Sequence, residues 1–277
     1  MMALELIALW LAAWAGNAWL AKQRFAGVRY IVPALFGVTV LVIWQLAVQS
    51  FAISPAILPP PSAIFARAMG SLPVLWGDFV QTFLRGALSG YLIGCMAAVI
   101  VAVLIDRNAF LQAGLLPIGN FAAALPIVGV APIMVMWFGF DWQSKAAVVV
   151  IMVFFPMLVN TMAGLRASEA MQRDLMATYS AGYWTSLLKL RLPAAMPFMF
   201  NGLKICSTLA PIGAIVAEFF GSPTQGMGFR INAEIGRTGL DMIWATIAVA
   251  ALAGSGFYGL VALIEKRVTF WHPSQRG

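Results

Sequence analysis

Seven stretches of about 20 or more mostly apolar residues dominate the sequence and limit what it can fold into. A helix that crosses the hydrocarbon core of a bilayer needs about 20 such residues. The stretches cover about residues 2–20, 31–52, 79–105, 110–138, 145–165, 195–219 and 242–264. With 62% hydrophobic and only 10% charged residues, the chain is too apolar for a soluble enzyme or a disordered chain. We therefore predict an all-α integral membrane protein.

The first stretch differs from a cleaved signal peptide. It begins MMALELIALWLAAWAG and has no basic residue before its apolar run, whereas signal peptides usually begin with positive charge. Trp10, Trp14 and Trp19 suit a membrane interface as well as a span. We expect a retained N-terminal helix that either crosses the membrane or lies at its surface.

The basic residues give the orientation. If the segment around Lys22 is cytoplasmic and each later span reverses direction, 11 Lys and Arg residues lie inside and four lie outside. This asymmetry follows the positive-inside rule and accounts for the net charge of +7. The basic residues are too scattered along the chain to bind the phosphates of a nucleic acid. The loop 166–194 and the tail 265–277 are then cytoplasmic, and the segments 53–78 and 219–241 face the opposite side.

Small residues and prolines indicate how the spans pack. Gly86, Gly90 and Gly94 recur every four residues and form a smooth helix face for a close neighbour. Prolines interrupt the fourth stretch at Pro117, Pro126 and Pro132. Such a broken helix either lines a substrate path or is kinked for packing.

The segment 167–197 is the longest polar interval on the predicted cytoplasmic side. We expect a short helix over 174–179, a break at 180–182, and a second helix over 183–191 that ends at Leu192-Pro193. Trp184, Leu187 and Leu188 share one face of the second helix at helical spacing. This unit either docks into a groove of a cytoplasmic partner or lies flat on the membrane interface.

This loop resembles the EAA loop of the permease subunits of binding-protein-dependent ABC importers. Asp174 takes the acidic position, Ser180 stands where glycine is usual six residues later, and Leu192-Pro193 closes the motif. Trp184 also matches a Trp of one branch of the family. The departures are Leu175 and Met176 in place of two alanines, and Ser180 in place of glycine.

The resemblance covers about residues 55–265, and over this range the sequence is similar to the nitrate, sulfonate and taurine branch of the family. The matching blocks are LPPPSAIFARA at 58–68, TFLRGALSGYLIG at 82–94, ALPIVGVAPIMVMWFG at 124–139, FFPMLVNTMAGLR at 154–166 and AEFFGSPTQGMGFRI at 217–231. The implied fold is a six-helix permease core at about 31–265 plus one extra N-terminal helix at about 2–20. The whole chain, 1–277, would be one transmembrane domain with the coupling loop at 166–194.

The resemblance also implies partners. Two permease copies, expected here as a homodimer in lipid, form the pathway in a bacterial inner membrane, and an extracytoplasmic substrate-binding protein delivers the solute. A cytoplasmic ABC ATPase dimer binds the loops and carries ATP and Mg²⁺. The chain itself has no Gly-x-x-x-x-Gly-Lys-Ser/Thr phosphate loop, and we expect it to bind no cofactor, metal or nucleic acid and to have no catalytic residue.

Two groups of candidate site residues follow from the resemblance. The expected ATPase-docking residues are Arg173, Asp174, Ala177, Ser180, Ala181, Gly182, Tyr183, Trp184 and Pro193. The expected pathway or gate residues are Asn120, Pro126, Trp137, Asn160, Lys204 and Glu218.

Several of these residues have a second interpretation. Asp174 either caps the first loop helix or pairs with a basic residue of the ATPase. Lys204 either lines the pathway or extends its long stem to the interface, and Glu218 belongs to an outer gate, contacts the binding protein or is a solvated helix end. Asn160 and the other polar pathway candidates equally suit bonds to a neighbouring helix.

Two other classes of membrane protein compete with this interpretation. An ion-coupled secondary transporter would carry acidic residues or His at mid-depth, where this chain has almost none. A membrane enzyme would need a cluster of reactive groups, but the one His is in the tail and Cys95 and Cys206 have no metal-ligand spacing. For the solute, the outer loop and the tail VTFWHPS favour pyrimidine or vitamin relatives over sulfonate or nitrate relatives.

Overall fold

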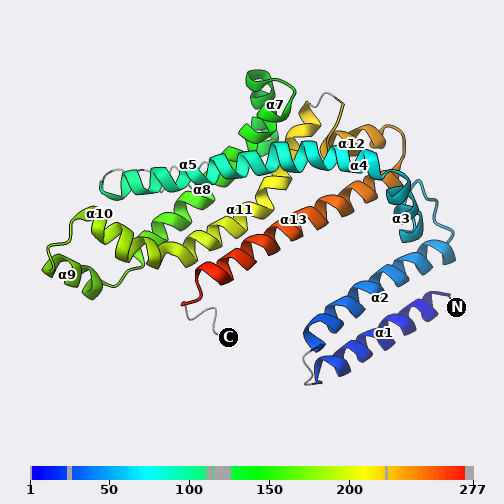
Figure 1. The fold of residues 1–277 in the computed structure, drawn as a ribbon. Helices are drawn as coiled ribbons and strands as arrows, with labels where there is room; N and C mark the ends of the chain where they lie inside the picture. The colour runs from blue at the N-terminus through cyan, green and yellow to red at the C-terminus, as the bar shows by residue number, and fades with distance from the viewer. Residues whose placement is uncertain are drawn as a thin grey trace. The chain divides into compact units, whose positions relative to one another are not determined.

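The computed structural model describes residues 2–23, 27–108, 110, 114, 126–221 and 224–271. These residues are mostly helical, and none of them lies in a β-strand (Figure 1). The all-α fold expected from the apolar stretches is confirmed.

Within the described residues, five helical segments are long and apolar enough to cross a membrane. They cover Val28–Ser50, Leu72–Ile105, Trp142–Arg166, Tyr183–Phe220 and Leu240–Val268. Two shorter apolar helices, α1 (Met2–Ala21) and α7 (Ile127–Phe138), lie within the first and fourth expected spans. Pro126 immediately precedes α7, while Pro117 lies outside the described residues. Each expected span therefore contains a helix.

The chain divides into two compact units, Met1–Leu72 with Ala233–Thr246 (unit 1) and Pro73–Asn232 with Ile247–Gly277 (unit 2). In unit 1, α1 packs against α2 (Val28–Ser50). The side chain of Gln45 on α2 accepts the backbone N–H of Ser62 at 3.0 Å, which holds the start of α3 (Pro61–Gly70). The single transmembrane domain expected for 1–277 stays a prediction.

Unit 2 is built around α8 (Trp142–Arg166), which packs against both α5 (Ser89–Asp106) and α11 (Leu192–Phe220) (Figure 1). Helix α5 continues without a break from α4 (Leu72–Phe79) and the π-helical η1 (Val80–Leu88). Val149, Val153 and Met157 of α8 are buried in the shared core. The central helix of the unit therefore has apolar contacts on two sides.

Small residues allow these helices to approach closely. A Cβ atom on Gly90 would lie 2.6 Å from the Cβ of Val149, and one on Gly202 would lie 3.0 Å from the Cβ of Asn160. Neither site has room for a larger side chain. The glycine face predicted along 86–94 is therefore a packing seam, and it faces α8.

The start of α8 is fixed by its cap. The carboxylate of Asp141 accepts the backbone N–H of Trp142 at 2.8 Å. Hydrogen bonds from the side chain of Gln81 and from this N–H lower the pKa of Asp141 below its ordinary value. Two residues before Asp141, Gly139 adopts a positive φ of +81°, which glycine tolerates, and this ends α7.

Candidate functional site

The loop between α8 and α11 opens with the helix α9 (Ala170–Thr178). It starts four residues before the position expected from the sequence. A capping box accounts for this, because the Glu169 side chain accepts the backbone N–H of Gln172 and the Gln172 side chain accepts the backbone N–H of Glu169. The expectation that Asp174 caps the helix is wrong, since Asp174 lies in its second turn with an exposed side chain.

A left-handed residue ends α9. Ser180 has a φ of +54°, its N–H donates to Ala177 O at 2.8 Å, and the N–H of Ala181 donates to Met176 O at 3.0 Å. This pair of bonds is the Schellman arrangement, in which glycine is the usual left-handed residue. Gly182 is extended, with a φ of −66°, and does not require glycine. The conformational demand of the break therefore falls on Ser180.

The second helix of the loop does not end at Leu192-Pro193. The helix end expected there is therefore wrong. α10 (Tyr183–Ser186), the π-helical η2 (Leu187–Arg191) and α11 form one continuous helix, Tyr183–Phe220. The N–H of Leu192 donates to Leu187 O, which makes one wide turn directly before Pro193. A wide turn accommodates proline, which lacks an N–H and whose ring clashes with the carbonyl four residues earlier in an α-helix.

The inner side of the loop is anchored to the end of α5. Two guanidinium nitrogens of Arg191 donate to the two carboxylate oxygens of Asp106 at 2.6 and 2.7 Å, and Tyr183 Oη donates to the same carboxylate at 3.0 Å. The buried Leu187 packs with Leu165 and Ala195. Such a two-pronged ion pair also fixes orientation. The sequence does not reveal this anchor, because an Asp at the end of an apolar stretch gives no sign of a partner 85 residues away.

The outer side of the loop exposes large apolar side chains. Met171 and Leu175 on α9 and Tyr179 directly after it follow one another every four residues, and Met171 and Tyr179 are 80% and 77% exposed. Trp184 and Leu188, four residues apart on the second helix, are exposed as well. We call these five residues the docking face.

The predicted docking residues are distributed around this face. Asp174, Ala177, Ser180 and Gly182 are exposed, and Ala181, Tyr183 and Pro193 are partly buried. The guanidinium of Arg173 binds the backbone carbonyl and the hydroxyl of Ser168, so it is held within the loop. No residue of α9 is buried. A nine-residue helix without buried contacts is marginally stable alone, and this favours a partner surface.

None of the predicted pathway residues belongs to the docking face. Pro126 and Trp137 are exposed at the start and the end of α7. Asn160 on α8 accepts a hydrogen bond from the side chain of Asn201 on α11 at 3.0 Å. Lys204 on α11, whose side chain is partly exposed, forms an ion pair with Glu265 of α13 (Leu240–Val268), at 2.7 Å. Asn120 lies outside the described residues.

Glu218 is not a solvated helix end, because its side chain is only 2% exposed. Its carboxylate accepts hydrogen bonds from the hydroxyl of Thr82 at 2.9 Å and from the N–H of Gly228 at 2.7 Å. It therefore touches neither solvent nor an outside protein in this conformation. Among the described residues, no group of three or more His, Cys, Asp or Glu side chains is placed to hold a metal ion.

Comparison with known proteins decides the family. The family model described as "binding-protein-dependent transport system inner membrane component" matches residues 90–270, which include the whole loop and Glu218. The chain belongs to this family. The permease is 32% identical to a probable ABC transporter permease protein of Haemophilus influenzae over 222 residues, 80% of this chain and 90% of that protein.

Two further relatives match over nearly their full length. The permease is 27% identical to a formylaminopyrimidine transport permease protein of Halalkalibacterium halodurans, over 88% of this chain and 96% of that protein. It is 30% identical to a riboflavin transport system permease protein of Chloroflexus aurantiacus, over 91% and 94%. The permease is thus the membrane subunit of an ABC importer and a multi-pass inner membrane protein.

Proposed function

We propose that the docking face binds a cytoplasmic ABC ATPase dimer, which carries ATP and Mg²⁺ and supplies the energy for transport. The observation that carries this proposal is the pairing of an anchored inner side with an exposed apolar outer side. Arg191 and Tyr183 fix the loop to Asp106, while Met171, Tyr179 and Trp184 remain uncovered. Aromatic residues on a rigid support are typical anchors of protein interfaces.

The same proposal gives the mechanism of coupling. Two permease copies form the pathway, and each contributes one loop to the ATPase dimer. When the ATPase dimer closes, each loop is displaced together with the helix Tyr183–Phe220, because no break separates them. The pathway then changes between two states, and ATP binding selects one of them.

The solute and its route complete the proposal. A substrate-binding protein delivers a small organic solute to the side of the membrane opposite the loop, and the C-terminus lies on the loop side. The similarity to formylaminopyrimidine and riboflavin permeases supports a pyrimidine-like or vitamin-like solute. The more distant similarity to aliphatic sulfonate and taurine permeases, at 26% and 25% identity, supports a sulfonate-like solute less strongly.

Purification of the tagged permease from its native membrane tests the assembly. Mass spectrometry should find an ATPase subunit with a phosphate loop, and a binding protein found with it would be assayed for the bound solute. Recovery of the permease alone, active in ion-driven uptake by proteoliposomes, would contradict the proposal.

Single substitutions then test the docking face. Trp184→Ala should weaken ATPase binding at least about tenfold, the cost typical of a Trp anchor. The matched control is Thr185→Ala, which truncates the neighbouring exposed residue. Asp174→Arg should also weaken binding while membrane insertion is retained. Unchanged ATPase binding by both Trp184→Ala and Asp174→Arg would exclude this surface.

A further inference from the structure

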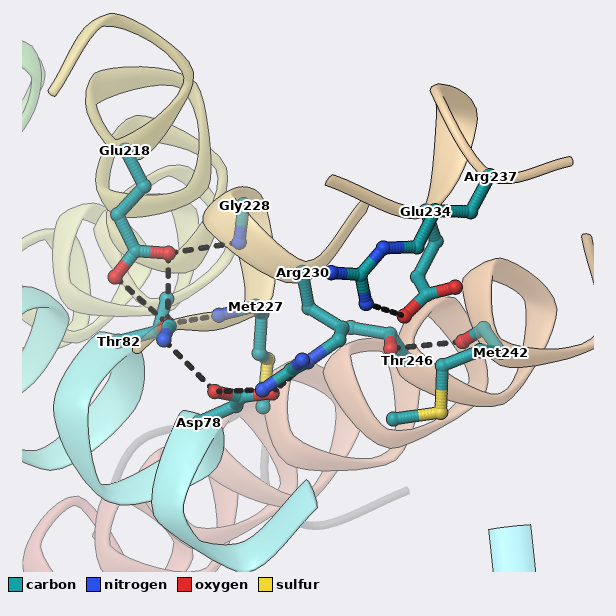
Figure 2. A network of polar contacts seen from close by, with 11 residues as sticks. Asp78, Thr82, Glu218, Met227, Gly228, Arg230, Glu234, Arg237, Met242 and Thr246 are labelled. Carbon is teal, nitrogen blue, oxygen red and sulfur yellow. Dashed lines mark hydrogen bonds and ion pairs between the residues drawn. The ribbon is translucent and has the colours of Figure 1, made fainter. Parts of the chain in front are cut away.

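The helix α12 (Met227–Ile235) begins with an unusual cap. Three successive backbone N–H groups donate to side chains of other helices: Gly226 to Asp78 at 2.8 Å, Met227 to Thr82 at 2.7 Å, and Gly228 to Glu218 at 2.7 Å (Figure 2). The first N–H groups of a helix have no partner within it, and negative side chains are favourable there. We call Asp78, Thr82 and Glu218 the socket.

The socket is internally connected and buried. The hydroxyl of Thr82 accepts the N–H of Met227 and donates to the carboxylate of Glu218 at 2.9 Å (Figure 2). Asp78 is also paired with Arg230 of α12, whose Nε lies 2.8 Å from its carboxylate. All three socket side chains are at most 2% exposed. Hydrogen bonds to buried carboxylates are among the stronger ones, so α12 is firmly held.

Glycines make the cap sterically feasible. Gly226 has a φ of +130°, and a Cβ there would collide with the carboxylate of Glu218. A Cβ on Gly228 would collide with the backbone carbonyl of Ile215. The Gly-Met-Gly sequence therefore lets the chain pass close enough for its N–H groups to reach the socket.

A buried lysine fixes the other end of the connection between α11 and α12. The ammonium of Lys145 on α8 donates to the backbone carbonyls of Gly221, directly after α11, and of Phe140. Its side chain is 1% exposed. The chain is thus held where it leaves α11 and where it enters α12.

The position of Glu218 links this cap to the loop. Glu218 and Trp184 lie near opposite ends of the continuous helix Tyr183–Phe220, about 50 Å apart at the usual rise per residue. A displacement of the loop along this helix therefore reaches the socket without passing through a flexible segment.

We propose that the socket makes α12 move together with the helix that starts at the docking face, so that α12 relays the state of the ATPase to the docked binding protein. Glu218 is then a positioning residue and not a group that contacts the solute. This inference rests on the proposed function of the loop, and it adds a specific device on the opposite side of the membrane.

Thr82→Val tests the socket, because it keeps the shape of the side chain and removes the bridging hydroxyl. The matched control is Thr161→Val on α8, which is equally buried and whose hydroxyl donates to Met157 O of its own helix. In the purified permease, amide exchange of 224–232 should become about tenfold faster in Thr82→Val and stay unchanged in the control. Thr82→Ser should restore the slow exchange.

A functional readout tests the relay in the reconstituted permease–ATPase complex. Thr82→Val should keep basal ATP hydrolysis and lose most of the stimulation by the loaded binding protein, with a raised half-maximal concentration. Thr82→Ser and Thr161→Val should be stimulated as the unchanged complex is. Stimulation of Thr82→Val at the normal level would overturn the relay.

Glu218→Gln is the second variant, which removes the charge but retains one acceptor. It should accelerate exchange of 224–232 and lower stimulation in the same direction as Thr82→Val. Normal exchange in both variants would overturn the socket. If no ATPase binds the unchanged permease, the proposed function fails, but the exchange experiment on the permease alone still decides the socket.

Discussion

At the scale of single residues, Ser180 shows how a family position and a backbone conformation coincide. The left-handed region costs a non-glycine residue about 1–2 kcal/mol. Ser180 has a φ of +54°, at the position where the sequence resemblance places a glycine. The spacing from Asp174 therefore located the residue correctly, and the structure supplies the physical reason for the glycine.

We expect Ser180→Gly to stabilise the end of α9 by about 1 kcal/mol, because glycine adopts this conformation without strain. Amide exchange of 170–180 should become about fivefold slower. Ala177→Gly is the control, since Ala177 lies inside the helix, where glycine costs about 1 kcal/mol and should accelerate exchange. A change in the same direction for both variants would contradict this account of the break.

The residues that the sequence did not reveal are those with distant partners. Asp106 directly follows one apolar stretch and Arg191 precedes another, and charges are expected at both kinds of position for many reasons. Lys204 was assigned either to the pathway or to the interface, but it pairs with Glu265. Glu218 was open to a solvated interpretation for the same reason, because its socket comes from residues 78–82 and 226–228. One sequence does not show which helices pack together.

At the scale of elements, hydropathy predicted each apolar helix, whereas local chemistry set the boundaries. The early start of α9 was missed because its cap is Glu169, and Glu is not among the preferred N-cap residues. The helix through Leu192-Pro193 was missed because proline normally ends a helix. In both places a specific hydrogen-bond arrangement outweighed the general preference.

The wide turn η2 leads to a prediction about Pro193. Pro193→Ala restores a backbone N–H and removes the ring clash, so the turn Leu187–Arg191 should return to α-helical spacing. The turn then spans one residue fewer, and this change in phase rotates Trp184 and Leu188 by about 100° relative to α11. ATPase binding should fall at least about tenfold, with normal membrane insertion. Pro197→Ala, inside α11, is the control, and equal binding by both variants would exclude the turn as the cause.

At the scale of the whole molecule, the long apolar stretches and the composition predicted the all-α membrane fold, since only helices satisfy the backbone of such stretches in lipid without a barrel. The sides of the membrane follow from charge. We predict from the distribution of Lys and Arg that the loop carrying Tyr179 and the tail carrying Phe270 lie on the basic side, and that the segment carrying Arg237 lies on the opposite side. All three residues are well exposed, and both native cysteines are buried.

Cysteine labelling tests this orientation directly. An impermeant maleimide added to spheroplasts, which lack the outer membrane, should label Arg237→Cys and leave Tyr179→Cys and Phe270→Cys unlabelled. In inverted inner-membrane vesicles the pattern should reverse, because the surface with the excess of Lys and Arg then faces the reagent. The unsubstituted chain is the control, since Cys95 and Cys206 lie in the apolar core of unit 2 and should stay unreactive. Labelling of Tyr179→Cys in spheroplasts would place the docking face outside the cell, where ATP is not supplied, and would contradict the proposed coupling to an ATPase.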